Sequence, residues 1–197
     1  MDRSIGKGSN WSAASASKGE RTFSNPAIKD VVTFVQTSDE TGGELTHLEI
    51  TLGPGGGNGL HRHVSFSEEF KVLEGKLGVQ VGKQSIQLAE GESEVAPLGT
   101  NHRFFNDSAK PVRFYVFLRP GHSGFENGLQ AAYGLARDGK VSSKGIPKNP
   151  LHLALLAEMT DTKPAGPMSI LNPVLHRLAQ TARRKHVDQE LAKYWAG

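Results

Sequence analysis

The sequence predicts a mainly β fold, a small antiparallel barrel or sandwich, followed by an α-helical extension. Two patterns indicate this fold class. Between residues 25 and 120, short apolar segments are separated about every 6 to 12 residues by Gly, Pro, Asn or Asp, which is typical of a sandwich or barrel rather than of alternating strands and helices. After residue 120, apolar side chains recur at a spacing close to 3.6, the period of an α-helix.

The strands are predicted from a period of two. In residues 46–52, apolar or small side chains alternate with polar ones, so that one face of the strand is expected to be buried. Similar segments predict four further strands, at residues 69–73, 77–81, 85–88 and 112–118.

Three helices are predicted in the extension, at residues 125–138, 149–159 and 168–185. In the third, the apolar residues between Leu171 and Ala182 fall on one face, whereas Arg183, Arg184 and Lys185 lie off it. We expect this helix to pack on the barrel or on a neighbouring subunit with its basic edge in solvent. The alternative is a basic edge that binds a membrane surface or an acidic partner.

Composition divides the chain into three parts. Residues 1–24 are rich in Ser, Gly, Lys and Ala, so their burial cannot offset the entropy of ordering them and a flexible tail is expected. Residues 25–120 form the predicted barrel, and residues 121–197 form the predicted helical extension. At 197 residues the chain is long enough for one well-packed domain with an extension.

Composition also excludes several classes of function. The chain has no Cys, which rules out disulfides, thiolate metal sites and cysteine nucleophiles. Its formal net charge is only +3, so nucleic acid is not an expected partner. No apolar run has the length of a signal peptide or of a bilayer-spanning helix, so we expect a cytoplasmic protein without a membrane partner.

Two short segments carry residues with metal-binding chemistry. The first follows Gly-Gly-Gly and holds His61, His63 and Glu68, and the second holds His102 after a Pro-Leu-Gly turn. Three imidazoles and one carboxylate suit a borderline divalent ion such as iron, manganese, nickel, copper or zinc, and fit calcium or magnesium poorly. Four protein ligands leave about two positions open on an octahedral ion, where water, oxygen or a small molecule can bind.

The phase of the strands distinguishes Glu68 from its neighbour Glu69. Side chains two apart in a strand point to the same side, so His61 and His63 face one side together. Glu68 shares its phase with an apolar pair, whereas Glu69 shares its phase with a more polar set. Glu68 is therefore the predicted ligand and Glu69 is expected outside the barrel, unless a bulge reverses the two.

No general acid or base can be named from the sequence, so the catalytic residues stay unassigned. Glu69 and His47 are candidates only if a bulge turns them inward. Asn106 is expected to hold a strand or turn in place rather than to touch a substrate. The remaining histidines are expected at the surface: His47, His122, His152, His176 and His186.

Two further features each have two interpretations. The glycines at residues 55–57 suggest a phosphate loop, but no Lys-Ser or Lys-Thr follows them and no helix begins there, so we interpret them as turn glycines. Four aromatic residues line either an aromatic-substrate pocket or the packed interior of the barrel, which small barrels fill with such side chains. The interior is the favoured interpretation for these four, which are Phe66, Phe70, Phe104 and Phe114.

Together the two segments resemble the two sequence motifs of the cupin superfamily. The first motif is G, five residues, H-x-H, three or four residues, E, six residues, G, and it is matched by Gly55, His61, His63, Glu68 and Gly75. The second motif is G, five residues, P-x-G, two residues, H, three residues, N, and it is matched by Gly91, Pro97, Gly99, His102 and Asn106. The resemblance covers residues 25–120 well and the extension only loosely.

The resemblance implies a cupin β-barrel, a double-stranded β-helix of the jelly-roll type, in a small single-domain bacterial protein with an appended helical tail. It also implies that one divalent transition metal binds to His61, His63, Glu68 and His102. Cupins with this ligand set include dioxygenases, isomerases and decarboxylases, so a metal-dependent enzyme that chelates a small organic substrate is expected. The alternative is a non-catalytic sensor or accessory module that binds a small ligand or a metal.

The resemblance also bears on assembly. Exposed edge strands of small barrels favour pairing, and many single-domain cupins are dimers, so a homodimer is expected. The alternative is that the helical tail covers one barrel face in the same chain. The sequence supports both arrangements.

Overall fold

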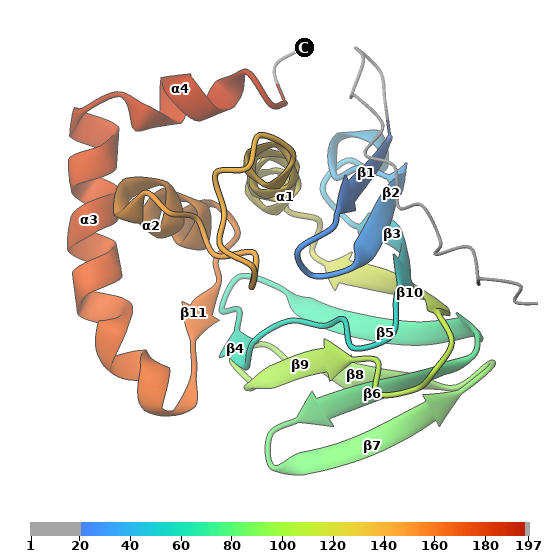
Figure 1. Ribbon diagram of the computed structural model, residues 1–197. Helices are drawn as coiled ribbons and strands as arrows, with labels where there is room; N and C mark the ends of the chain where they lie inside the picture. Colours follow the sequence, from blue (N-terminus) through green and yellow to red (C-terminus); the bar gives the residue numbers. More distant parts are fainter. Residues whose placement is uncertain (1–20, 196–197) are drawn as a thin grey trace, which may run out of the picture.

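The computed structural model describes residues 21–195, and its architecture is mainly β with a helical extension, as predicted (Figure 1). Two antiparallel sheets share one apolar core, and the helices lie along one side of the sheets. Within this part of the chain, no helix combines the length and the apolar character that crossing a membrane requires.

The strands form one sheet of six and one of five. In sheet order, the six-stranded sheet contains β1 (Thr22–Asn25), β2 (Asp30–Gln36), β3 (Thr46–Leu52), β10 (Val112–Arg119), β5 (Ser67–Glu74) and β8 (Ser93–Ala96). The five-stranded sheet contains β11 (Lys163–Pro164), β4 (His61–Arg62), β9 (His102–Phe105), β6 (Lys76–Val81) and β7 (Gln84–Ala89). The five predicted strand segments are confirmed as β3, β5, β6, β7 and β10.

The extension contains more elements than the sequence predicted. Its helices are α1 (Ser123–Arg137), α2 (Pro150–Met159), α3 (Asn172–Arg184) and α4 (Val187–Ala192), and the chain also has the short 3-10 helices η1 (Asp39–Thr41) and η2 (Gly166–Leu171). The helix predicted at residues 168–185 is divided, because its first residues belong to η2. Pro173 lies in the first turn of α3. A backbone N–H at this position has no acceptor within the helix, so proline costs no helical hydrogen bond here.

The helix α3 packs mainly on α2 rather than on the barrel itself. It buries Ala179 and Ala182, whereas Arg183 forms an exposed ion pair with Glu158 of α2. The basic end of α3 is therefore solvated, as predicted, but the helix packs on α2 and not on the barrel.

Alternation along the central strands directs their apolar side chains into the core. Because β10 lies between β3 and β5, Val116 faces Leu48 on one side and Phe70 on the other. Burying an apolar side chain of this size stabilises the fold by roughly 1.5–3 kcal/mol. The four aromatic residues predicted to fill the interior are all buried: Phe66, Phe70, Phe104 and Phe114.

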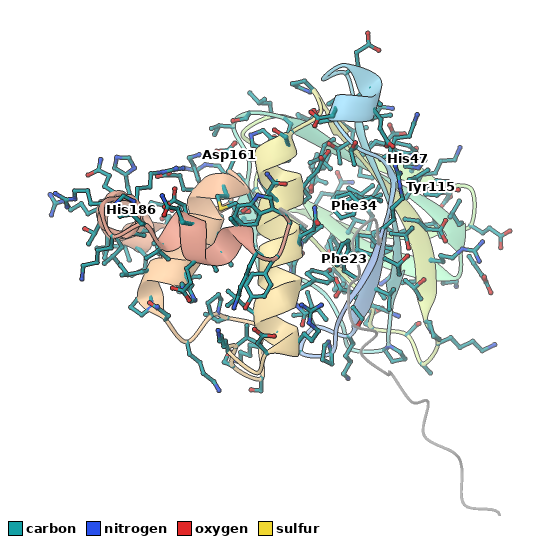
Figure 2. All side chains as sticks on the ribbon, turned by 90° about the horizontal axis from the view of Figure 1, so that it is seen from above. Phe23, Phe34, His47, Tyr115, Asp161 and His186 are labelled. Atoms are coloured by element: carbon teal, nitrogen blue, oxygen red, sulfur yellow. The ribbon has the colours of Figure 1, made fainter. Side chains whose placement is uncertain are left out.

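The helix α1 closes the core next to β1 and β2. Its Tyr133 is buried in the same apolar cluster as the residues of both sheets. Figure 2 shows Phe23 and Phe34 on the side of β2 that faces α1, and His47 and Tyr115 on the opposite side. The six-stranded sheet therefore has one face in the core and one face outward.

The first strand begins inside the segment that composition assigned to the tail. Residues 1–20 lie outside the described part of the chain, but residues 22–24 belong to β1 and pair with β2. Phe23 explains this difference, because its ring packs edge-on against Phe34 with 5.8 Å between the ring centroids. The division of the chain into three units at residues 24 and 120 stays a prediction.

A buried carboxyl group joins the sheet to α1. Tyr133 donates a hydrogen bond of 2.5 Å to Asp30 Oδ2, whereas Asp30 Oδ1 has no hydrogen-bond partner among the described residues. Burial raises the pKa of Asp30 from 3.8 to about 7, and the hydrogen bond from Tyr133 opposes this rise only in part. The folded protein therefore holds a proton that the unfolded chain has lost between about pH 4 and 7, and its stability falls as the pH rises through that window.

We expect Asp30→Asn to stabilise the protein increasingly as the pH rises from 5 to 8, because Asn accepts the Tyr133 hydrogen bond without a buried charge. The gain in the free energy of unfolding should grow by about 2–4 kcal/mol over this range, measured by urea denaturation. The exposed Asp39→Asn is the control and should follow the unsubstituted protein. Parallel stability curves for Asp30→Asn and the unsubstituted protein would contradict the raised pKa.

Candidate metal centre

Four polar side chains from both sheets meet at one point inside the barrel. His61 begins β4, and His102 begins β9 directly opposite it in the five-stranded sheet. His63 follows β4, and Glu68 comes from β5 of the six-stranded sheet. One ligand atom from each residue lies within 4.8 Å of the other three, so the structure brings together all four predicted site residues.

Aromatic rings shield the four side chains from water. The exposed fractions of the four residues range from 2% to 9%. Phe66 stacks on His63 with 4.4 Å between the ring centroids, and Phe125 of α1 meets the same ring edge-on at 6.0 Å. In such a poorly solvated site, the attraction between a cation and its ligands is stronger than in water.

Backbone carbonyl groups orient the three imidazole rings. The Nδ1 atoms of His61 and His102 each donate to the carbonyl oxygen two residues earlier, at 2.7 and 2.8 Å. His63 Nδ1 donates to the carbonyl oxygen of Asp161, at 3.2 Å. Because Nδ1 carries the proton in the neutral rings of His61 and His63, their Nε2 atoms present lone pairs to the centre, as in histidines that bind metals. His102 Nε2 instead donates a hydrogen bond to Glu68 Oε2 at 2.9 Å.

The chemistry of this donor set fits a divalent cation. His61 Nε2 and His63 Nε2 lie 3.0 Å apart, and in neutral rings neither atom carries a proton, so their lone pairs repel. Glu68 brings Oε2 to 2.9 Å from His102 Nε2 and Oε1 to 3.8 Å from His63 Nε2. A divalent ion among these atoms removes the repulsion and compensates the carboxylate charge, and imidazole with carboxylate suits a transition metal.

The electrostatics of the site keep Glu68 ionised and His61 neutral. Burial by itself raises the pKa of Glu68, but the hydrogen bond from His102 and the attraction of the imidazoles outweigh burial and lower the pKa to about 2. Burial, together with repulsion from the other two imidazoles, lowers the pKa of His61 to about 4. Burial also lowers the pKa of His102, but its pairing with Glu68 outweighs burial and raises that pKa above its ordinary value. Metal binding therefore has to break the hydrogen bond between His102 Nε2 and Glu68 Oε2.

The two candidates for a general base lie outside the barrel. Glu69 is on the outer face of the six-stranded sheet, where Arg119 Nη1 donates to its carboxylate at 2.9 Å. His47 is on the same face, with the rings of Tyr115 and Phe117 each 4.5 Å from its own. The predicted phase of β5 is thus confirmed, and no bulge turns either candidate towards the centre. Neither residue can exchange a proton with a molecule bound there.

Asn106 and the glycine-rich loop have the structural roles that the sequence predicted. Asn106 Nδ2 donates to the carbonyl oxygens of Leu52 and Lys110, at 2.9 and 2.8 Å, and so holds the turn before β10 against β3. Gly57 has a φ of 147°, and a Cβ atom there would lie 2.7 Å from the carbonyl oxygen of Phe104. The loop is therefore a turn that approaches β9 too closely for any other residue.

The remaining histidines are not all at the surface. His152 of α2 is only 4% exposed, with its Nε2 3.4 Å from Glu190 Oε1 of α4. It is buried because α2 is apolar around most of its circumference and has no solvated face at this position. His122 caps the N-terminus of α1, where its Nδ1 accepts the N–H three residues later. The exposed positions predicted for His176 and His186 are confirmed.

Asp161 is the residue near the centre that the sequence did not indicate. It follows α2, 98 residues after His63, and its carbonyl group orients the ring of His63. Its carboxylate also accepts the backbone N–H groups of Val64 and Ser65, at 2.6 and 2.7 Å. No local pattern signals such a contact, because its two ends are far apart in the chain.

Residues 48–118 match the family model described as the cupin domain. This segment contains all four residues of the centre and most strands of both sheets. The resemblance to the cupin superfamily is therefore confirmed for this segment of the chain. Residues 120–195, with the helices and β11, lie outside the match.

Several solved structures are similar to part of the chain. TT1209 from Thermus thermophilus is 29% identical, and the match covers 47% of this chain and 84% of that one with a TM-score of 0.43. KdgF from Halomonas sp. is 17% identical, with 48% and 83% covered and a TM-score of 0.44. A predicted oxalate decarboxylase from Thermotoga maritima is 16% identical, with 46% and 80% covered and a TM-score of 0.45. No curated protein matches the sequence.

We expect His61→Ala and His102→Ala each to lower the affinity for a divalent metal by at least about tenfold, because each removes one of four donors from the site. Metal content after dialysis against a limiting metal concentration measures this effect. Normal metal content in both variants would show that the metal is held elsewhere.

The adjacent carboxylates provide a matched comparison. Glu68→Gln removes the anionic donor and should lower metal content, whereas Glu69→Gln changes a side chain that pairs with Arg119 on the outer face and should leave metal content unchanged. Equal losses of metal in the two variants would contradict the assignment of Glu68 to the inner face of β5 and of Glu69 to its outer face.

Proposed function

We propose that the protein binds one divalent transition metal at His61, His63, Glu68 and His102 and acts with it on a small organic molecule. The observation that carries this proposal is the convergence of three oriented imidazole rings and one carboxylate at a buried point. The match of residues 48–118 to the cupin domain supports it.

The ligand set favours iron, manganese, nickel, copper or zinc. Imidazole nitrogen suits these ions, whereas calcium and magnesium prefer shells made of oxygen. When bound, such an ion supplies Lewis-acid or oxygen-activating chemistry at positions that the protein leaves open. A reaction of the dioxygenase, isomerase or decarboxylase type on a chelating substrate fits this chemistry.

The chain's own residues would hold the ion and keep water away from it. The backbone carbonyls maintain the orientation of each imidazole, and Glu68 supplies one negative charge. Phe66 and Phe70 pack against His63 and His102, respectively, and limit the access of water to the donor atoms. The exclusion of water strengthens each electrostatic interaction inside the site.

A non-catalytic module that binds a metal or a small ligand is the second candidate function. It is favoured by the surroundings of the centre, since no lysine, tyrosine or second carboxylate within residues 21–195 hydrogen-bonds to any of the four side chains. Metal exchange separates the candidates, because it changes the turnover of an enzyme, whereas a binding module keeps its ligand.

The proposed assembly is a homodimer. The strand β11 of the extension pairs with the edge of β4 within the same chain. This pairing favours the alternative that the extension, and not a second subunit, covers part of the barrel. The strands β1, β8 and β7 still end their sheets in the described part of the chain and are the edges available for pairing.

Elemental analysis of protein purified without chelator or an affinity metal is the direct test of the proposal. We expect about one transition-metal ion per chain. Iron, manganese or nickel would direct screening to oxygen uptake and isomerisation of chelating substrates, whereas zinc would favour Lewis-acid chemistry or a structural ion. A protein that contains no metal and takes up none on titration would contradict the proposed function.

A further inference from the structure

Besides Phe125 of α1, a second part of the extension reaches the centre, the short segment of residues 161–165. In this segment β11 pairs with β4, with Lys163 opposite Arg62 and Pro164 opposite His61. The strand that carries His61 therefore lies between β9 and a strand from the extension, next to the helices (Figure 1). A piece of chain outside the cupin match thus completes the sheet at the metal site.

Asp161 joins the start of this segment to His63 and to the turn that follows it. Its carbonyl oxygen accepts a hydrogen bond from His63 Nδ1 at 3.2 Å. Its Oδ2 accepts the backbone N–H groups of Val64 and Ser65 at 2.6 and 2.7 Å, and its Oδ1 pairs with Lys163. One residue thus orients the ring of His63 and also holds the backbone beyond it.

His63 differs from the other two imidazoles in what orients it. His61 and His102 each donate to a carbonyl group two residues earlier, so their orientation is part of their own segments. The carbonyl group that orients His63 comes from a residue 98 positions away. The orientation of this one ring therefore depends on how the extension docks.

The backbone of Asp161 also indicates a specific role. Its φ of 49° lies in the left-handed region, which is uncommon for residues other than glycine. It follows Thr160, the C-cap of α2, at a position where glycine is the usual residue. Glycine would lack the carboxylate that accepts the N–H groups of Val64 and Ser65. Residues that are held in an uncommon backbone conformation by their surroundings, as Asp161 is, are found mainly at functional sites.

We propose that Asp161 is a positioning residue through which the helical extension sets the orientation of His63, so that docking of the extension and metal binding stabilise each other. This inference rests on the metal site proposed above. By linkage, a metal that binds best to the oriented ring also favours the docked extension, and undocking weakens metal binding by the same factor. Contacts that orient a metal ligand typically change affinity by about 10–100-fold.

The substitution Asp161→Gly tests the contribution of the Asp161 carboxylate separately from that of its backbone carbonyl group. Glycine adopts the left-handed conformation freely and retains the carbonyl group, so α2 still ends normally while Val64 and Ser65 lose their acceptor. We expect this variant to bind Co²⁺ about 10–100-fold more weakly in a calorimetric titration. The visible spectrum of bound Co²⁺, which reports ligand geometry, should also change. Asp161→Asn keeps an acceptor oxygen and should recover most of the lost affinity.

Asp138→Gly is the matched control for a lost carboxylate in the extension. Asp138 accepts a hydrogen bond from Tyr194 at 2.7 Å, away from the four-residue centre, so this variant should bind Co²⁺ like the unsubstituted protein. If Asp161→Gly keeps the affinity and the spectrum while His102→Ala loses binding, the metal site stands and the positioning role is overturned. If the unsubstituted protein binds no Co²⁺, both the proposed function and this inference are overturned.

Amide hydrogen exchange provides a second test that needs no variant. Addition of Co²⁺ to the full chain should slow exchange at residues 161–165 as well as in β4, β5 and β9, because docking and metal binding are coupled. Slower exchange in those three strands with no change at residues 161–165 would overturn the coupling.

Discussion

The meeting of four polar side chains at one buried point is the constraint on which the rest of the structure depends. Buried polar atoms without partners cost free energy, so each nitrogen and oxygen at the centre needs a neighbour in a defined place. Because Glu68 lies in one sheet and His61 and His102 in the other, the centre forms only when both sheets have their observed register. A slip of one residue in β5 would turn Glu68 to the outer face of the sheet, away from the three imidazoles.

The part of the centre that the barrel supplies could be predicted from the sequence because its determinants are local. Alternation along β5 separates Glu68 from Glu69, and the structure places Glu69 beside Arg119 on the outside. Alternation also predicted β3, since a period of two reports which face of a strand is buried, and the turn residues between apolar segments indicated the other four strands. The burial of Phe66 and Phe70 was predicted because small barrels fill their interior with such side chains, although the sequence did not show that these rings pack on the imidazoles.

The part that the extension supplies could not be predicted, because it consists of contacts between distant segments. Asp161 looks in the sequence like any aspartate at the end of a helix, and its contact with His63 arises only when α2 docks against the barrel. The strand β11 has two residues, too few to show a period. The burial of His152 likewise depends on α4, which the sequence did not predict.

The enclosure of the centre bears on the choice between an enzyme and a binding module. A chelating substrate needs open positions beside the metal, yet the four donor residues are at most 9% exposed. Phe66 and Phe125 cover His63 on the side of α1, and Phe125 lies in the first turn of that helix, where backbone N–H groups have no helical acceptor. That turn is anchored, because His122 Nδ1 accepts the N–H of Phe125 at 2.8 Å and the buried Glu126 carboxylate accepts the N–H of Ser38 at 2.6 Å. Turnover of a chelating substrate therefore requires the side chains that enclose the donors to move apart, whereas a permanently bound structural ion requires no such motion.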